Sequence, residues 1–322
     1  MSAFSAEAPA APLRVDIAIV TRDRPALLAQ LLESLDTLIL AEPVPEVRIV
    51  VVDNAPDATA AEVCREAADR GRFPLLYIHE KRCGIPQARN AALRAGIADA
   101  DCIAFIDDDE LPHEDWLAAL LFAQARWDAD VVTGPSEPWF ENGAPGWIVA
   151  SGFFEPPAHA DGAVLTTAYT NNVLVRTRAL ANLEPLFDER LALTGSSDSE
   201  FFGRVARAGR SIRWCAGART RERIGPTRAR AGWILQRSFR HGNAAGFVGT
   251  QCQQPARSRW SVAAQGVWCL VRGSASLAWA ALRGRAAWVK PLTLASVGCG
   301  LLASSWGVVY EEYRQIHGGD DA

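Results

Sequence analysis

The chain lacks the cysteine patterns that mark disulfide-rich or zinc-binding proteins. Its seven cysteines are odd in number and widely scattered, and no two of them form a CxxC pair. This usage favours reduced thiols in a cytosolic setting over a disulfide framework or a zinc site. The amino-terminal residues also lack the basic start and the apolar block of a signal peptide. We therefore expect residues 1–12 to be a flexible tail.

Glycine-rich phosphate loops are absent as well. The sequence contains neither GxGxxG nor GxxxxGK(S/T), so neither a dinucleotide-binding fold nor a P-loop is supported. The composition, 49% hydrophobic and 22% charged, is that of a globular protein with little room for long disorder. A length of 322 residues allows one large domain or two smaller ones.

Acidic residues are almost missing from the carboxyl-terminal third. Residues 203–290 contain sixteen arginines and one lysine but a single acid, Glu222, although the whole chain carries a net charge of −4. This asymmetry predicts an anionic partner for that part of the chain. Nucleic acid and an anionic membrane are the two obvious candidates.

Tryptophan and aliphatic side chains lie among these arginines, which favours a lipid headgroup interface over the reading of base edges. We therefore expect an anionic membrane surface, and no nucleic acid, as a partner. The tryptophans are Trp260, Trp268, Trp279, Trp288 and Trp306.

Residues 291–310 run without a charge, a length that would just cross a hydrocarbon core of roughly 30 Å. The run is only moderately apolar, and its Gly and Ser residues also fit a helical hairpin packed on the domain. Both alternatives stay open, and we expect residues 246–322 to be a helical, membrane-associated region. If the run spans, the basic flank before it and the acidic residues after it place the rest of the chain at the cytoplasmic face of the cell membrane.

The amino-terminal part alternates between strand and helix patterns. An apolar run at 15–20 is followed by leucines at helical spacing between 27 and 35. The unit repeats with apolar runs at 47–52, 75–78 and 102–106 and with helical patterns at 60–68 and 85–98. Such alternation predicts an α/β fold whose central sheet is mostly parallel and covered by helices on both faces.

The tripeptide Asp107-Asp108-Asp109 closes the run at 102–106 and is followed by Glu110. Ligands of α/β sheets bind at the carboxyl ends of the strands. Carboxylates crowded at such an end repel one another unless a hard cation such as Mg²⁺ or Mn²⁺ neutralises them. The alternative interpretation of the triplet is a solvated acidic turn with a helix cap.

Polar residues at the other strand ends are consistent with a nucleotide pocket. Asp53 would accept from a base imide, and Thr21 would offer its backbone. Arg89 and Lys81 would meet phosphate charge, and Arg is better suited to a bidentate grip. Each residue alone is more often a cap, a turn or a surface charge, so the prediction depends on their coincidence at one sheet edge.

Taken together, these motifs resemble those of family 2 glycosyltransferases with the GT-A fold. The resemblance covers about residues 15–243, so we expect a catalytic domain over 13–245. This variant of the motifs is similar to that of enzymes that extend lipid-linked exopolysaccharide repeats. The resemblance is carried by residues 17–22 (IAIVTR), 51–54 (VVDN), 84–90, 105–110 (FIDDDE), 171–176 (NNVLVR), 187–198 and 233–237.

The resemblance implies an inverting, metal-dependent transfer of a hexose from a UDP-sugar to a lipid-linked or glycan acceptor. It implies that Asp107 and Asp108 face the ribose and the sugar, and that Asp109 binds Mn²⁺ or Mg²⁺ on the diphosphate, where the metal offsets charge on the leaving UDP. The residues expected to hold the UDP are Thr21, Arg22, Asp53 and Arg89.

Direct displacement needs a base for the acceptor hydroxyl. Our candidate is Asp198, in a polar loop that turns into a helix. Related enzymes carry a Glu-Asp pair there, and Ser197 replaces that Glu. Glu200 is the second choice, and the alternative is that Ser197 or Asp198 only caps the helix.

Several further residues fit the resemblance less specifically. Asn171 and Asn172 would either reach the donor sugar or simply open a strand. Trp139 and Trp147 would either stack on the acceptor or pack in the core, which is the default. Glu222 stands where some relatives carry a metal-ligating His, but we expect it to pair with Arg221 or Arg223. The residues expected to close over the diphosphate are Arg228, Arg237 and His241.

Two other functions remain open at this stage. A nucleotidyltransferase that joins a sugar phosphate to an NTP would use the same carboxylates, but it would be expected to show a Gly-rich loop after the first strand, and residues 21–25 contain no glycine. A non-catalytic, sugar-binding membrane scaffold of the same fold is the other alternative. The replacement of the relatives' Glu by Ser197 favours it.

Overall fold

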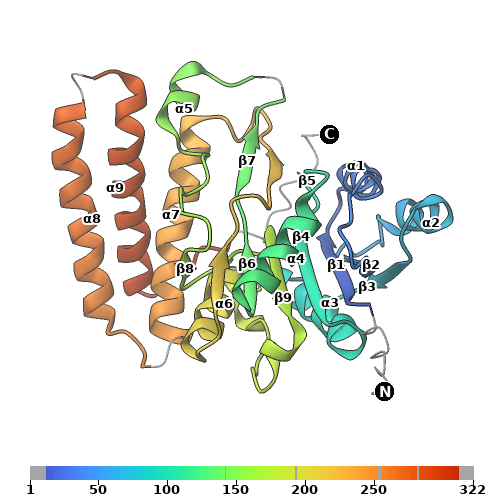
Figure 1. Cartoon of the computed structure of the whole chain (residues 1–322). Coiled ribbons are helices and arrows are strands. Elements are labelled where there is room, and N and C mark those ends of the chain that lie inside the picture. The colour runs from blue at the N-terminus through green and yellow to red at the C-terminus, as the bar shows by residue number, and fades with distance from the viewer. Residues whose placement is uncertain (1–11, 142, 193, 253–254, 281–282, 312–322) are drawn as a thin grey trace, which may run out of the picture.

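A computed structural model describes residues 12–141, 143–192, 194–252, 255–280 and 283–311. The predicted tail, apart from residue 12, and the acidic residues beyond 311 lie outside this part of the chain. The described residues build an eight-stranded sheet, a small three-stranded sheet and a layer of long carboxyl-terminal helices (Figure 1). The eight strands lie in the order β3-β2-β1-β4-β9-β6-β10-β8.

The first half of the large sheet is parallel, as predicted. Its strands are β1 (Arg14–Thr21), β2 (Glu46–Asp53), β3 (Leu75–His79) and β4 (Cys102–Asp107). The helices α1 (Pro25–Leu35), α2 (Ala61–Arg70) and α3 (Ile85–Asp99) connect them. The register places Thr21 opposite Asp53 and Val20 opposite Asp107, so three strands end at one edge.

The second half of the large sheet is mixed. Strand β9 (Asn172–Arg176) runs antiparallel to β4 and to β6 (Val131–Thr133), and β8 (Val164–Leu165) runs antiparallel to β10 (Ile212–Trp214). Only β6 and β10 pair in parallel there. The prediction of a mostly parallel sheet therefore describes the amino-terminal half, and the fold as a whole has a mixed sheet.

A second, smaller sheet lies at the carboxyl end of β4. It consists of β5 (Glu110–Pro112), β11 (Thr220–Arg223) and β7 (Ser136–Trp139). Its register sets Glu222 opposite Glu110. The remaining helices of this part are α4 (Trp116–Trp127), α5 (Gly146–Ser151) and α6 (Ser197–Arg207), with short 3₁₀ turns at Thr177–Leu180 and Glu189–Leu191.

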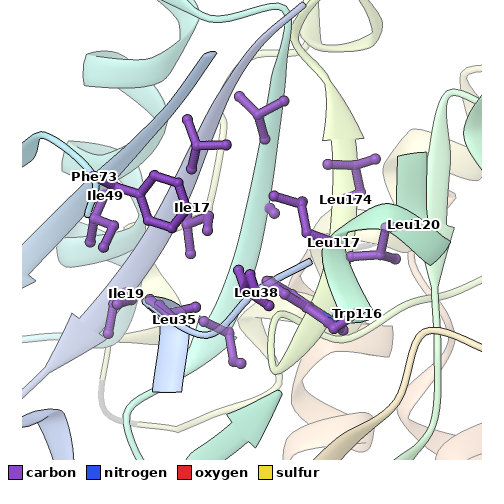
Figure 2. Packing of buried hydrophobic residues seen from close by; sticks show 14 of the residues in the cluster. Ile17, Ile19, Leu35, Leu38, Ile49, Phe73, Trp116, Leu117, Leu120 and Leu174 are labelled. Carbon is purple, nitrogen blue, oxygen red and sulfur yellow. The ribbon is translucent and has the colours of Figure 1, made fainter. Parts of the chain in front are cut away.

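Two apolar clusters fill the two faces of the sheet. Successive side chains of a strand point to opposite faces, so Ile17 and Ile19 join one cluster while Ala18 joins the other. Figure 2 shows Ile17 and Ile19 with Leu35 and Trp116 in the first cluster. Because both faces are covered, β1 and β4 read as continuous apolar runs, which is why their positions were predictable.

Three long helices form a layer beside the sheet (Figure 1): α7 (Ala231–Phe247), which continues into a π turn at Val248–Cys252, α8 (Arg259–Ala280) and α9 (Arg285–Ser305). Helix α9 lies between α7 and α8 and contacts both. The predicted domain boundary at 245/246 falls inside α7, so the helical region begins within an element of the predicted catalytic domain.

Glycines bring α9 very close to α7. A Cβ on Gly300 would stand 2.0 Å from the carbonyl oxygen of Phe239, and one on Gly242 would stand 2.1 Å from that of Val297. Side chains add hydrogen bonds between the two helices, among them Ser296 Oγ to the Leu235 carbonyl at 2.7 Å. Among the described residues, α9 is the one helix long and apolar enough to cross a membrane, with a hydropathy of 1.4.

Candidate active site

The acidic triplet lies at the end of β4, where the sequence predicted it. Asp107 is the last residue of the strand, and Asp108 is buried beside β1. Thr21 Oγ1 donates to Asp108 Oδ2 at 2.7 Å, and Arg24 Nη1 donates to Asp108 Oδ1 at 3.2 Å. The hydroxyl of Thr21 therefore holds a carboxylate, a contact that the sequence analysis did not anticipate.

Asp109 is held between two arginines. Its Oδ2 lies 3.5 Å from Arg24 Nη1 and 3.3 Å from Arg228 Nη1. Arg228 also binds Glu222 through Nη2. The prediction that Glu222 pairs with Arg221 or Arg223 was wrong, because neighbours along strand β11 point to opposite faces of the small sheet.

The cluster carries more negative charge than its surroundings compensate. Burial, together with repulsion from neighbouring carboxylates, raises the pKa of Asp107 to about 7 and that of Asp108 to about 6, even though Arg89 and Arg24 oppose the shift. Hard oxygen donors short of positive charge are the ligands that Mg²⁺ and Mn²⁺ prefer. The donor set fits such an ion.

The protein would contribute few ligands to that ion. No group of three or more His, Cys, Asp or Glu side chains that could hold a metal occurs among the described residues. Mg²⁺ is usually bound through one or two carboxylates plus substrate phosphates. Asp109, with 19% of its side chain exposed against 7% for Asp108, is the residue that would hold it.

Glu110 and Asn172 are structural residues beneath the triplet. Oε1 of Glu110 accepts from Ser136 Oγ at 2.9 Å and from Asn171 Nδ2 at 2.8 Å, and Oε2 accepts from Thr220 Oγ1. Asn172 uses its whole amide, accepting from an indole and donating to two backbone carbonyls. Asn172 therefore has no free amide for a sugar, whereas a contact of Asn171 to the donor sugar remains a prediction.

The residues predicted to hold UDP gather at the same edge. Asp53 is fully buried and accepts from the backbone amides of Ala55 and Ala60, both at 2.8 Å, so it also shapes the loop after β2. Arg22 lies beside them and donates to Cys83 Sγ at 2.8 Å. Their contacts to a nucleotide remain a prediction.

Arg89 connects this edge to helix α6. Its Nη1 lies 2.9 Å from Ser197 Oγ, and its charge opposes the rise in the pKa of Asp107. The Ser that replaces the Glu of related enzymes thus leaves Arg89 without a carboxylate at that contact. The guanidinium also stacks 5.6 Å from the ring centre of Phe187.

Asp198 stands in the first turn of α6, and its charge contributes to the raised pKa of Asp107. The residue at the N-cap position is Ser196, whose side chain makes no capping hydrogen bond, so the alternative that Asp198 satisfies a free amide of the first turn stays open beside its role as a base. Asp198 Oδ1 accepts from the Ser199 amide at 2.8 Å. Glu200, the second choice for the base, is buried and paired with Arg204 Nε at 2.7 Å, which commits it to the helix.

A cavity of about 470 Å³ adjoins the acidic edge. It brings together Arg228, Arg237 and His241, the three residues predicted to close over a diphosphate. Burial and the charge of Arg237 lower the pKa of His241 to about 4, so its imidazole is neutral at pH 7. The other lining residues are Phe153, Phe154, Pro157, Tyr169, Glu222, Ser238, Thr293 and Val297.

The sequence analysis did not identify Arg24 as a site residue, and it did not distinguish Trp139 from Trp147. Arg24 precedes Pro25, the first residue of α1, so its place directly after β1 was a usable signal. Trp147 packs against the apolar cluster around Ile148 and Ile234, whereas Trp139 is 40% exposed. Stacking of Trp139 on an acceptor sugar remains a prediction.

Comparisons with known proteins agree with this geometry. The model of the family described as Glycosyl transferase family 2 matches residues 16–183. The succinoglycan biosynthesis protein ExoM of Rhizobium meliloti (strain 1021) is 31% identical over 255 residues, which cover 79% of this chain and 81% of ExoM.

Solved structures of S. aureus TarS share the fold. The fragment 1–349 in complex with UDP-GlcNAc has a TM-score of 0.53 at 14% identity, with 92% of each chain covered. The same fragment in complex with UDP has a TM-score of 0.51 at 16% identity, with 96% of this chain and 95% of the fragment covered. A longer TarS chain has a TM-score of 0.52 at 16% identity; 80% of this chain is covered, and it spans 49% of that protein.

Proposed function

The chain belongs to glycosyl transferase family 2, and from this premise we propose that it transfers a hexose, with inversion, from a UDP-sugar to a lipid-linked or glycan acceptor in exopolysaccharide synthesis. The observation that carries the proposal is the acidic end of β4, with Asp198 at the start of α6 near enough for its charge to raise the pKa of Asp107. Membership of this family argues against the alternative that the chain is a nucleotidyltransferase. Likeness to ExoM supports the exopolysaccharide setting.

The donor would bind across the carboxyl ends of β1, β2 and β4. Thr21, Arg22, Asp53 and Arg89 would hold the uridine diphosphate part, and Asp107 and Asp108 would face the ribose and the sugar. Asp109 would hold Mn²⁺ or Mg²⁺, which when bound supplies Lewis-acid stabilisation to the departing diphosphate. Arg24 and Arg228, which already contact Asp109, would stay at its side as additional positive charge.

Asp198 would take the proton of the acceptor hydroxyl. One of its oxygens accepts from the Ser199 amide, which fixes the carboxylate and leaves Oδ2 to receive the proton. Proton transfer by such a positioned group typically contributes 10²–10⁴-fold to the rate.

The test is UDP release from candidate UDP-sugars, with and without Mn²⁺ or Mg²⁺. Asp198→Asn is expected to lower turnover by roughly 10²–10⁴-fold while calorimetry still detects UDP binding. Asp109→Asn is expected to abolish stimulation by the metal. The matched control is Asp99→Asn, an exposed carboxylate at the end of α3, just before β4 begins.

Two outcomes would contradict these assignments. Unchanged turnover in Asp198→Asn would show that Asp198 is not the base. Unchanged metal stimulation in Asp109→Asn would show that Asp109 is not the metal ligand. A wild-type protein that binds no UDP-sugar and releases no UDP would revive the non-catalytic scaffold.

The carboxyl-terminal helices would attach the enzyme to the cytoplasmic membrane surface. Exposed apolar residues follow one face of α8 at helical spacing: Trp260, Val267, Trp268 and Val271. Arg257, Arg259 and Arg272 accompany them, and no acid lies between residues 223 and 310. An amphipathic basic helix with tryptophan on its apolar face is typical of attachment in the plane of anionic headgroups.

Helix α9 is the alternative membrane segment, and its contacts favour a packed role. It lies between α7 and α8 and is bonded to α7 through Ser296 and through the amide of Asn243, which donates to the Gly300 carbonyl at 3.3 Å. A helix that spanned a bilayer would have to leave these partners or carry α7 with it. We therefore propose surface attachment through α8 and not a span by α9.

A further inference from the structure

The loop after β1, residues 22–24, meets the loop after β2, residues 54–60, at the side chain of Asp23. Thr59 Oγ1 lies 3.5 Å from Asp23 Oδ1, and Arg22 Nε lies 3.7 Å from Asp23 Oδ2. Both distances are long for a hydrogen bond, and they are the polar contacts of this carboxylate among the described residues. The side chain is 27% exposed. Asp23 therefore keeps lone pairs available to a ligand.

The backbone on both sides of this contact is unusual. Asp23 has a φ of 56°, and Ala58, the neighbour of Thr59, has a φ of 53°. Residues other than glycine adopt this left-handed region uncommonly, and such backbone clusters at sites that bind ligands. Two separate loops thus accept a strained conformation at the place where they meet, which favours a binding role for the space between them.

The other acids of this edge are committed or lie apart. Asp53 is fully buried and accepts from three donors, two backbone amides and a tyrosine hydroxyl. Glu80, directly after β3, accepts from the guanidinium of Arg82 at 2.9 Å. Asp57 is exposed, and among the described residues it bonds to no other loop. Of these four acids, Asp23 is the one that is both accessible and placed between two loops.

Arg24 indicates how a nucleotide would lie along this edge. It contacts Asp108 and Asp109 at the end of β4, whereas its neighbour Asp23 contacts the loop after β2. Strand β1 lies between β2 and β4 in the sheet (Figure 1). A nucleoside diphosphate whose phosphates lie over the end of β4 would therefore place its base on the β2 side, beside Asp23 and Thr59.

An ionised carboxylate at that position selects for a base that can donate. It can only accept hydrogen bonds. Atom N3 of uracil carries a proton, which the carboxylate would accept. Atom N3 of cytosine carries a lone pair, which the carboxylate would repel. A site built to bond one N–H group discriminates strongly against an analogue that lacks it.

We propose that Asp23 reads the base of the donor by accepting the N3 proton of uracil, and that Asp53 acts on the base only by shaping the loop after β2. The inference rests on the proposed use of a UDP-sugar. It assigns to Asp23 the imide contact that the sequence alone predicted for Asp53, and it makes Asp23 the residue that selects uridine over cytidine.

Calorimetric titration of UDP, CDP and N3-methyl-UDP, with Mg²⁺ present, tests the contact. Asp23→Asn keeps the shape of the side chain and tolerates the left-handed backbone, but its amide can donate to N3 of cytosine. We expect the ratio of UDP affinity to CDP affinity to fall by about tenfold to a hundredfold in this variant, the usual effect of losing a hydrogen bond to a charged group. N3-methyl-UDP, which has no imide proton, should bind the wild type more weakly than UDP.

Two further variants locate the effect. Asp57→Asn removes a charge from the loop after β2 and is the matched control, with an unchanged ratio expected. Asp53→Asn should lower the melting temperature, because its amide group would face a backbone donor, and the folded protein should keep the wild-type preference for UDP. The result for Asp23→Asn decides the matter even where Asp53→Asn does not fold.

Three results would overturn the inference: an unchanged ratio in Asp23→Asn, a lost preference in folded Asp53→Asn, or equal binding of UDP and N3-methyl-UDP by the wild type. Failure of the proposed function has a different outcome. In that case the wild type would bind none of the three nucleotides and release no UDP from any UDP-sugar.

Discussion

At the scale of single residues, Glu110 shows how burial changes the chemistry of an acid. Burial raises its pKa well above the usual value, and the charges of Asp107 and Glu222 add to the rise. Three donors surround it, from Ser136, Asn171 and Thr220. The carboxyl group therefore links the small sheet to the entry of β9.

Glu110→Ala is expected to lower the free energy of unfolding by about 1–3 kcal/mol, because it leaves buried donors without an acceptor. Glu110→Gln, which resembles the protonated acid, should cost much less. Urea denaturation at pH 7 measures both. Glu46→Gln, at the exposed start of β2, is the control, and equal stabilities of Glu110→Ala and the wild type would contradict the prediction.

The raised pKa of Glu110 should also make the stability of the protein depend on pH. A folded-state pKa above the unfolded value means that the native state holds the proton more tightly, so its contribution is complete below about pH 4.3 and is lost as the pH rises through the raised pKa. Wild-type stability should thus fall, as the pH rises above about 4.3, more steeply than that of Glu110→Gln. Parallel curves from denaturation at several pH values would contradict this.

The sequence predicted which residues carry charge at the site but not how the charges pair. Asp107 to Asp109 were found from their position after an apolar run, a local signal. The bridge from Arg228 to Asp109 and Glu222 joins residues far apart in the chain, and only the small sheet, which no pattern announced, brings them together. Pairings of this kind depend on tertiary contacts that periodicity does not record.

At the scale of elements, the close approach of α7 and α9 makes one glycine far more sensitive than another. Gly300→Ala would put a methyl group 2.0 Å from a carbonyl oxygen of α7, which forces the helices apart and should cost about 1–3 kcal/mol. Gly232→Ala, where a Cβ meets nothing within 4 Å, should stabilise α7 by up to about 1 kcal/mol. Thermal melts of the two variants that shift by equal amounts would contradict the predicted contact.

Elements buried on both faces were the predictable ones. Strands β1 to β4 were placed within one or two residues, because their apolar runs end sharply at polar loops. Strands β5, β7 and β11 have three or four residues each, too few for a period to appear. The antiparallel course of β9 was also hidden, because its apolar pattern is the same in either direction.

At the scale of the whole molecule, α8 forms the outer side of the helical layer (Figure 1). The protein is expected to float with vesicles that contain anionic lipid, to bind neutral vesicles weakly and to be released by about 1 M salt, which screens surface charge within about 3 Å. A double change, Trp260→Gln with Trp268→Gln, should reduce binding. Phe122→Gln, an exposed aromatic residue on α4, is the control, and retention after the salt wash would favour insertion.

The sequence left the choice between a span and a packed helix undecided for a physical reason. Length and hydropathy describe a helix by itself, and α9 meets both criteria. Its close packing on α7 depends on glycines in both helices: Gly300 of α9 lies against the Phe239 carbonyl of α7, and Gly242 of α7 lies against the Val297 carbonyl of α9. That information resides in the partner helix.

The interleaving of the carboxyl-terminal helices also bears on how the protein is made. Helix α9 is synthesised after α7 and α8, yet it occupies the space between them. At roughly 5–20 residues per second, the nascent chain spends on the order of seconds with the glycine-bearing side of α7 uncovered. A version of the chain that ends before α9 would keep that surface of α7 bare for its lifetime, so such a fragment is expected to aggregate.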